Sequence, residues 1–154
     1  MGSSYTNVCV HLIFHTKNTS IRMREMDLSR IFHYIGGTIR GLTGHICRVG
    51  GRPDHIHILT SLPPTLSIAD FVRKIKSNSS KWIKSLHEIY KDFSWQDGYG
   101  IFSVSESNKE TVIQYIEHQR EHHETRSTND EFALFLKRNG FLKDRHSTEK
   151  AEDA

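Results

Sequence analysis

The stretch Pro53-Asp54-His55-Ile56-His57-Ile58-Leu59-Thr60 constrains the fold more than any other part of the chain. Its isoleucine, leucine and threonine residues favour a β-strand, and turn signals flank it, Gly50-Gly51-Arg52-Pro53 before and Pro63-Pro64 after. Because successive side chains of a strand point to opposite faces, His55 and His57 share one face and the isoleucines take the other. The pattern predicts a buried strand with a core on one side and a histidine pair on the other.

The spacing of His55 and His57 suits a pair of metal ligands. Cα atoms two residues apart on a strand are about 6.6 Å apart, and imidazole nitrogens bind a metal at about 2.0–2.2 Å, so both rings can reach one ion. The same spacing also arises by chance in a chain with 11 histidines, where packing is the usual role. Asp54 could orient one of the rings or only form a turn, and His11 could point toward this face or only pack. The pair therefore predicts a metal site only if a third ligand and a nucleophile lie near it.

Apolar periodicity elsewhere predicts the remaining secondary structure. In chain order, the predicted elements are strand 5–16, helix 27–43, strand 45–49, the histidine strand, a helix from Ser67 with its apolar stripe running to Ile89, strand 101–105, helix 107–125 and helix 129–138. This order is that of a ferredoxin-like (RRM-like) split βαβ, an α+β fold with one four-stranded antiparallel sheet and two helices on one face. The additional C-terminal helices could cover the other face and complete a site.

Local signals mark the helix ends. A capping box combines a hydrogen-bonding side chain at the helix start with an acid or amide three residues later, and a glycine often ends a helix. The predicted starts are Asp27, Ser67 with Asp70, and Ser107 with Glu110, and the predicted ends are Gly44 and Gly140. The glycine-rich turn at 50–53 makes strand 45–49 a hairpin partner of the histidine strand.

Length and composition limit the class of protein. A chain of 154 residues predicts one domain, here residues 1–142, followed by a mobile tail over 143–154 without apolar periodicity. Cys9 and Cys47 lack CxxC spacing, which argues against a zinc finger or disulfide framework and fits a reducing cytoplasm. We find no signal-peptide pattern and no apolar run of membrane-spanning length, so we expect a cytoplasmic protein with no membrane partner. The net charge of +3 permits a nucleic-acid partner without requiring one.

The predicted helix at 107–125 carries a second chemical pair. Tyr115 and Gln119 are four residues apart, so they stand on one face of the helix, one turn apart. A tyrosine hydroxyl can attack phosphorus, and an amide oxygen can bind a hard cation such as Mg²⁺ or Mn²⁺. A tyrosine on an amphipathic helix more often lies at the edge of a core. The pair therefore gains meaning only together with the histidines.

The helix that starts at Ser67 has a basic face. The residues on this face are Arg73, Lys74, Lys76, Lys81 and Lys84. They can contact the phosphates of a nucleic acid, and Trp82, Trp95 or Tyr99 could stack on its bases. A solvated lysine face and core tryptophans explain the same pattern.

Taken together, these motifs resemble those of the single-tyrosine HUH transposases, small insertion-sequence (IS200/IS605-like) enzymes that act on single-stranded DNA. HUH stands for histidine, hydrophobic residue, histidine, which matches His55-Ile56-His57, and the family's tyrosine-x-x-x-glutamine helix matches Tyr115 to Gln119. The early strand ending in Lys17 and the stretch 95–105 resemble the family's first strand and its approach to the last strand. The resemblance covers roughly residues 4–139.

This resemblance implies a function and a site. His55 and His57 would hold a divalent metal, Mg²⁺ or Mn²⁺, with Gln119 as the third protein ligand, and Tyr115 would be the nucleophile. The enzyme would cut one DNA strand, keep the 5′ phosphate as a phosphotyrosine and release a 3′ hydroxyl. Family members are dimers that recognise DNA hairpins near the ends of their element, and the tyrosine helix of one subunit can serve the histidines of the other. We therefore expect a homodimer with shared active sites.

Three other functions fit part of the pattern. The first is a single-stranded nucleic-acid-binding module of the same fold that forms no covalent adduct. The second is a phosphoesterase of the histidine-triad kind. Such an enzyme requires a third alternating histidine, but this chain has Leu59 at that position. This function also leaves Tyr115 and Gln119 unexplained. The third is an HUH nickase of replication or plasmid mobilisation. Those enzymes are generally larger and usually place the tyrosine before the histidines.

Overall fold

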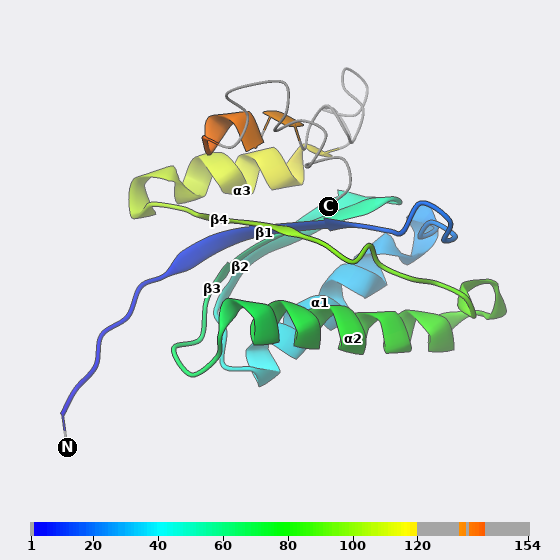
Figure 1. Cartoon of the computed structure of the whole chain (residues 1–154), viewed down its shortest axis with the longest axis horizontal. Helices are drawn as coiled ribbons and strands as arrows, with labels where there is room; N and C mark the ends of the chain where they lie inside the picture. The colour runs from blue at the N-terminus through cyan, green and yellow to red at the C-terminus, as the bar shows by residue number, and fades with distance from the viewer. Residues whose placement is uncertain (1, 120–132, 135, 141–154) are drawn as a thin grey trace.

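The computed structural model describes residues 2–119, 133–134 and 136–140. Within these residues, four strands form one sheet in the order β2-β3-β1-β4, and every neighbouring pair is antiparallel (Figure 1). The strands are β1 (Cys9–His15), β2 (Ile46–Arg52), β3 (His55–Ser61) and β4 (Gly100–Ser103). The longer helices are α1 (Leu28–Gly41), α2 (Ile68–Leu86) and α3 (Lys109–Glu117), and short 3-10 helices are η1 (Glu25–Asp27), η2 (Glu88–Tyr90) and η3 (Glu106–Asn108).

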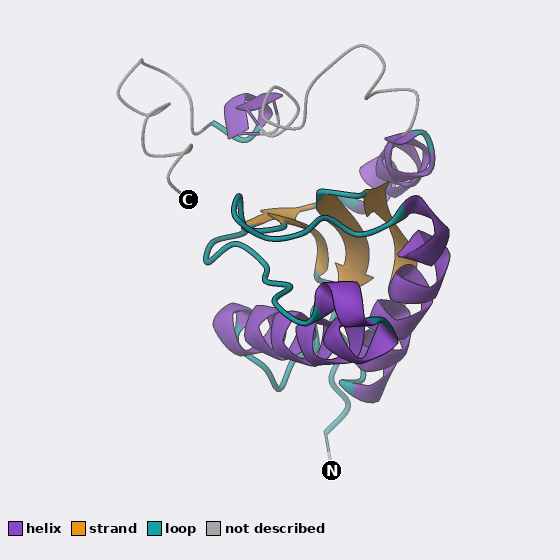
Figure 2. Ribbon diagram, turned by 90° about the vertical axis from the view of Figure 1, so that its right-hand side faces the viewer, coloured by secondary structure: helices purple, strands orange, loops and turns teal. Residues whose placement is uncertain are grey.

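The sheet separates two helical layers. Helices α1 and α2 cover one face of the sheet, and α3 lies across the other (Figures 1 and 2). This arrangement confirms the predicted ferredoxin-like α+β fold, and α3 occupies the face that the split βαβ plan leaves open. None of the described helices has the length and apolar character needed to cross a membrane.

The main core lies between the sheet and the α1–α2 layer. Its fully buried members include, from the strands, Leu12, Phe14, Ile56 and Ile58 and, from the helices, Ile31, Ile35, Ile39, Phe71 and Ile75. Because side chains alternate along a strand, the residues between these strand positions point toward α3. A smaller cluster of Cys9, Leu59 and Ile116 packs on that side. The prediction of a strand with an apolar face and a histidine face is confirmed.

The hairpin between β2 and β3 is tighter than predicted. The sequence predicts a turn over residues 50–53, but Gly50 and Gly51 lie inside β2 and pair with β3, so that only Pro53 and Asp54 form the turn. At Gly51, where φ is +151°, an added Cβ would lie 2.2 Å from a carbonyl oxygen of β3. A glycine inside a strand marks a place where another part of the chain approaches closely. The prediction of a four-residue turn is therefore wrong.

Asp27 takes the predicted N-cap position of α1, but other helix ends differ in detail from the prediction. Asp27 precedes α1 but makes no capping hydrogen bond, and Ser107 lies within η3, so α3 starts at Lys109 without a capping box. Helix α1 ends before Gly44, because Thr43 already takes the left-handed conformation with φ of 68°. The Asp27 carboxylate binds Arg24 and Tyr90 instead, and the Ser107 hydroxyl contacts that of Ser105. Local sequence signals do not reveal these partners.

Other predicted ends agree with the structure. The Ser67 hydroxyl accepts a hydrogen bond from the Asp70 backbone N–H at 3.1 Å, and Gly140 follows helical residues with φ of +83°.

Strand β1 starts at Cys9, four residues later than predicted. The predicted helical residues 120–125 and 129–132 and the tail 143–154 lie outside the described residues.

Asp27 joins η1 to η2 through a buried hydrogen-bond cluster. Its carboxylate accepts from the Arg24 Nε at 2.7 Å and from the Tyr90 hydroxyl at 2.5 Å. The Tyr90 hydroxyl in turn accepts from the Arg24 backbone N–H at 2.8 Å. Burial raises the pKa of Asp27, but the hydrogen bonds from Arg24 and Tyr90 outweigh it, so the pKa lies below its usual value. The ionised carboxylate therefore stabilises the folded state.

We expect Asp27→Asn to lower the free energy of unfolding at pH 7 by about 1–3 kcal/mol, because it weakens buried, charge-assisted hydrogen bonds. The stabilisation by Asp27 should be complete above its unfolded-state pKa of about 3.9 and should be lost as pH falls through the lower folded-state value. Urea unfolding between pH 7 and pH 2 measures both effects. Asp70→Asn, which removes an exposed partner of Arg73, is the matched control and should cost less than about 0.5 kcal/mol. Equal losses in the two variants would contradict the prediction.

Candidate active site

The two histidines of β3 lie on the face of the sheet that α3 covers. His55 is 1% exposed and His57 is 2% exposed. Their ring centroids are 5.0 Å apart and the ring planes are inclined by 82°. Strand alternation thus brings the two imidazoles together as predicted, in a buried position in one of the two central strands of the sheet.

Gln119 reaches the first of these histidines from the end of α3. Its Oε1 lies 2.9 Å from the Nε2 of His55, although the two residues are 64 positions apart in the chain. The amide nitrogen of Gln119 donates to the Tyr115 carbonyl at 3.3 Å, which holds the side chain against the last turn of the helix. Gln119 is 2% exposed, so the amide is part of the buried site.

Tyr115 lies beside the second histidine. Its ring centroid is 5.6 Å from that of His57, with the planes inclined by 77°. The side chain is half-buried at the edge of the cluster formed by Cys9, Leu59 and Ile116. The structure therefore places Tyr115 and Gln119 with the two histidines within one chain.

A glycine of β2 allows α3 to lie this close to the sheet. A Cβ at Gly50 would lie 2.6 Å from the Cγ2 of Ile116 and 3.0 Å from its carbonyl oxygen. The ion pair between Arg48 and Glu117, at 2.8 Å, adds a second link between β2 and α3. Sequence reasoning assigned Gly50 to a turn and missed this role. The signal that could have found it is a glycine within a strand, which often marks close approach of another backbone.

Two further side chains contact the Nδ1 atoms of the histidine pair. The Asp54 carboxylate lies 2.8 Å from the Nδ1 of His55. The Nε2 of His11 lies 2.9 Å from the Nδ1 of His57. Of the two alternatives that the sequence leaves open for each residue, the structure favours the one in which Asp54 and His11 contact the pair.

Burial keeps the neighbouring histidines of β1 uncharged. It lowers the pKa of His11 to about 3. Burial also lowers the pKa of His15 to about 4, helped by the nearby His55 and opposed by Asp54. Both β1 histidines are therefore neutral imidazoles near pH 7.

Residues 4–119 match the sequence family described as "Transposase IS200 like". This chain belongs to that family. Among curated proteins, the ISDra2 transposase TnpA of Deinococcus radiodurans is 31% identical over 74 residues, which are 45% of this chain and 53% of that protein. The matched stretch thus spans about half the length of this relative.

Two solved structures are similar to this IS200-like family member in fold. One is a protein of Deinococcus radiodurans R1 assigned as a transposase, with a TM-score of 0.59, 23% identity, and coverage of 77% of this chain and 96% of that one. The other is a REP-associated tyrosine transposase bound to a REP hairpin, with a TM-score of 0.58, 17% identity, and coverage of 79% and 74%. At these identities the likeness concerns the fold alone.

The donor atoms of the site fit a hard divalent cation. Two imidazole nitrogens and one amide oxygen come together at His55, His57 and Gln119. In the part of the chain that the structure describes, no three histidine, cysteine, aspartate or glutamate side chains form a group that could hold a metal ion. A metal here would therefore depend on the amide of Gln119. Oxygen and imidazole donors together suit Mg²⁺ or Mn²⁺ better than thiolate-seeking metals.

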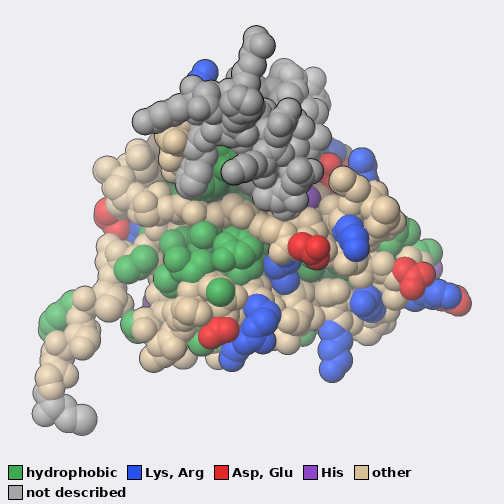
Figure 3. All heavy atoms as spheres, viewed as in Figure 1, with side chains coloured by type: hydrophobic (Ala, Val, Ile, Leu, Met, Phe, Trp, Pro, Cys, Tyr) green, Lys and Arg blue, Asp and Glu red, His purple; other side chains and the backbone are tan. Residues whose placement is uncertain are grey.

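The predicted basic residues lie apart from this site. Helix α2 covers the opposite face of the sheet from α3, so DNA that touches both must pass around an edge of the sheet (Figure 1). In the view of Figure 3, lysine and arginine side chains lie over the α2 half of the molecule, interspersed with acidic ones. Arg73 is exposed and pairs with Asp70 at 3.2 Å. Lys81 and Lys84 are exposed, and Lys74 is half-buried.

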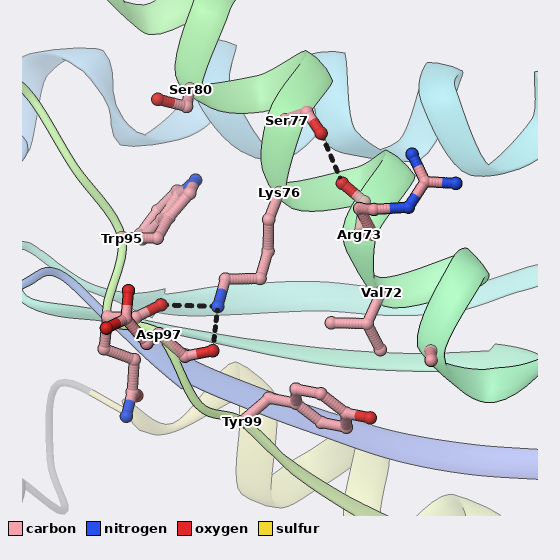
Figure 4. Close-up of a pocket in the computed structure, with 10 residues that line it drawn as sticks. Val72, Arg73, Lys76, Ser77, Ser80, Trp95, Asp97 and Tyr99 are labelled. Carbon is pink, nitrogen blue, oxygen red and sulfur yellow. Dashed lines mark hydrogen bonds between the residues drawn. The ribbon is translucent and has the colours of Figure 1, made fainter.

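Lys76 holds a loop. Its ammonium group donates to the carbonyl oxygens of Gln96 at 2.5 Å and Asp97 at 3.4 Å (Figure 4). It also donates to the carbonyl oxygen of Gly98 at 3.1 Å. Burial lowers the pKa of Lys76. Beside it, a cavity of about 360 Å³ opens between α2 and the loop, with Tyr99 in its lining. Lys76 thus has its hydrogen atoms directed at backbone carbonyl groups of the loop.

The two tryptophans belong to the core side of the fold. Trp95 is 5% exposed, meets Phe14 edge to face at 4.8 Å, and donates its Nε1–H to Ser79 at 3.0 Å. Trp82 packs against the core and stacks on Tyr34 with centroids 4.5 Å apart. The idea that Trp95 stacks on bases is therefore wrong, because the side chain is buried in the core.

We expect Gly50→Ala to push α3 away from the sheet, because the new Cβ would overlap Ile116. Overpacking of this kind costs about 1–3 kcal/mol, and Tyr115 should move away from His57 together with the helix. Urea unfolding and nuclear Overhauser contacts between Tyr115 and His57 measure the change. Gly37→Ala, at an exposed helical position with no atom within 4 Å, is the control and should be neutral or stabilising. An unchanged Tyr115–His57 contact in Gly50→Ala would refute the role.

Proposed function

We propose that this protein is a transposase that nicks and rejoins single-stranded DNA through a 5′-phosphotyrosine on Tyr115. The observation that carries this proposal is the meeting of α3 with the histidine face of β3. The Tyr115 ring lies 5.6 Å from that of His57, and the Gln119 oxygen lies 2.9 Å from His55. A phenol, two imidazoles and an amide thus meet in one site, and membership of the IS200-like transposase family supports the same function.

The chemistry assigned to each residue follows from its atoms. The Tyr115 oxygen would attack a backbone phosphorus, form a phosphate–tyrosine bond and break the bond to the 3′ oxygen, which leaves with a proton as a 3′ hydroxyl. His55, His57 and Gln119 would hold a divalent cation. That cation supplies polarisation of the phosphoryl oxygens and neutralises charge in the transition state.

Strand joining is the reverse of this step. A 3′ hydroxyl attacks the phosphotyrosine, the phosphate–tyrosine bond breaks and Tyr115 recovers its proton. Because the phosphotyrosine replaces one phosphodiester with another, the reaction needs no ATP.

The proposed substrate is single-stranded DNA with hairpin ends. One protein of similar fold is described as bound to a REP hairpin, which supports a hairpin partner. We assign phosphate contacts to the exposed Arg73, Lys81 and Lys84 and to the half-buried Lys74 of α2. Lys76, also a predicted DNA contact, is better assigned to holding the loop at Gln96 and Gly98. The homodimer with shared active sites stays a prediction, and the contacts of Tyr115 and Gln119 would also allow a complete site within one chain.

The decisive experiment looks for a covalent protein–DNA product. The protein is incubated with Mn²⁺ and single strands that tile the DNA flanking its own gene, and the products are run on a denaturing gel. A strand labelled at its 3′ end should become attached to the protein, and the same strand labelled at its 5′ end should yield a free fragment that a polymerase can extend. Binding without any covalent band would indicate a non-catalytic module of the same fold. A covalent band that retains only the 5′ label would contradict the proposed polarity.

A further inference from the structure

A third histidine, His11 of β1, contacts the site from its neighbouring strand. It is 2% exposed, and its Nε2 lies 2.9 Å from the Nδ1 of His57. The two ring centroids are 5.1 Å apart, with planes inclined by 31°. In the β1–β3 register His11 is opposite Leu59, so His57 is its diagonal neighbour on the same face. The sheet itself therefore determines this contact.

A hydrogen bond between two imidazole nitrogens needs a proton on one and a lone pair on the other. If the Nε2 of His57 binds a cation, a neutral His57 must carry its proton on Nδ1. That N–H can then donate only to the Nε2 of His11, whose own proton must be on its Nδ1. We propose that His11 is a positioning residue that holds His57 in the Nδ1–H tautomer, with the Nε2 lone pair directed at the metal position. This inference rests on the proposed metal role of His57.

The surroundings of His11 suit an acceptor. A neutral imidazole has one protonated and one unprotonated nitrogen, so His11 with its proton on Nδ1 can accept a hydrogen bond at Nε2, the atom that lies against His57. His11 would act on the metal through the orientation of His57, because its Nε2 is directed at that ring.

The two metal-facing histidines thus have different partners on Nδ1. Asp54 supplies a carboxylate to His55 at 2.8 Å, whereas His11 supplies a neutral ring to His57. Both types of partner fix a ring and its tautomer. A neutral partner does so without adding a negative charge next to His57.

The tautomer can be measured in the metal-free protein by long-range ¹H–¹⁵N NMR of the imidazole nitrogens. We expect His57 in the wild-type protein to show a protonated Nδ1 and an unprotonated Nε2, and His11 to show the same pattern. A proton on the Nε2 of His57 would overturn the proposal. This measurement needs neither DNA nor activity, so it stands even if no covalent DNA product forms and the proposed function fails.

Mn²⁺ binding by calorimetry gives the second readout. His11→Leu should weaken Mn²⁺ binding by about 10–100-fold, and His11→Gln, which keeps an acceptor oxygen, should restore most of the affinity. His33→Leu, at an exposed position on α1, is the control and should bind Mn²⁺ like the wild type. Equal Mn²⁺ affinity in His11→Leu and wild type would overturn the proposal, as would equal losses in the Leu and Gln variants. If His11→Leu fails to fold, the wild-type tautomer still decides the question.

Discussion

Tyr115→Phe should abolish the covalent protein–DNA product while the protein stays folded and still binds DNA. Phenylalanine keeps the ring that meets His57 at 5.6 Å but lacks the oxygen that would attack phosphorus. Loss of a nucleophile of this kind lowers the rate by about 10⁴-fold or more, so no band should be visible on a denaturing gel. Near-ultraviolet circular dichroism and a gel-shift assay with the same strands check folding and DNA binding.

The control for this variant is Tyr34→Phe. Tyr34 stacks on Trp82 in the helical layer on the other face of the sheet, so removal of its hydroxyl should leave cleavage unchanged. A covalent band that persists in Tyr115→Phe would mean that another residue attacks the DNA. Loss of DNA binding together with cleavage would instead show that the hydroxyl serves recognition.

Removal of the metal, or of one of its ligands, is the second change with a large expected effect. A chelator or the substitution His57→Ala should lower cleavage by about 10³-fold, because several kcal/mol of transition-state stabilisation would be lost. His57 is buried and next to Tyr115, so its loss removes a donor from the centre of the site. Cleavage assays at a series of Mn²⁺ concentrations, with and without chelator, measure the effect.

The matched substitution for this test is His33→Ala, which removes an exposed imidazole from α1. It should leave both cleavage and its dependence on Mn²⁺ unchanged. If wild-type protein cuts equally well with and without chelator, the metal site is excluded and the histidines need another role. If His57→Ala regains full activity at high Mn²⁺, His57 serves metal affinity alone.

Much of the fold could be predicted because the signals are local. Alternation marks β1 and β3, helical spacing marks α1 and α2, and a serine cap marks the start of α2. The errors lie where a residue serves a distant partner. Gly50 accommodates Ile116 instead of a turn, and Asp27 binds Arg24 and Tyr90 instead of capping a helix.

The candidate site divides in the same way. The spacing of His55 and His57 already places both rings on one face, and the spacing of Tyr115 and Gln119 does the same on a helix. Neither pattern contains the partner of His57 on β1. That contact depends on the diagonal register of two antiparallel strands, which no local sequence signal specifies.

The amino-acid sequence by itself determined the order of the elements and the orientation of each chemical pair within its own strand or helix, because both follow from short-range backbone periodicity. Only the tertiary structure decided that the pairs meet. Their contact spans 64 residues from His55 to Gln119 and depends on how closely α3 packs on β2 at Gly50. Packing of this kind is set by side-chain volumes on two distant segments at once, so it exists only in the folded chain.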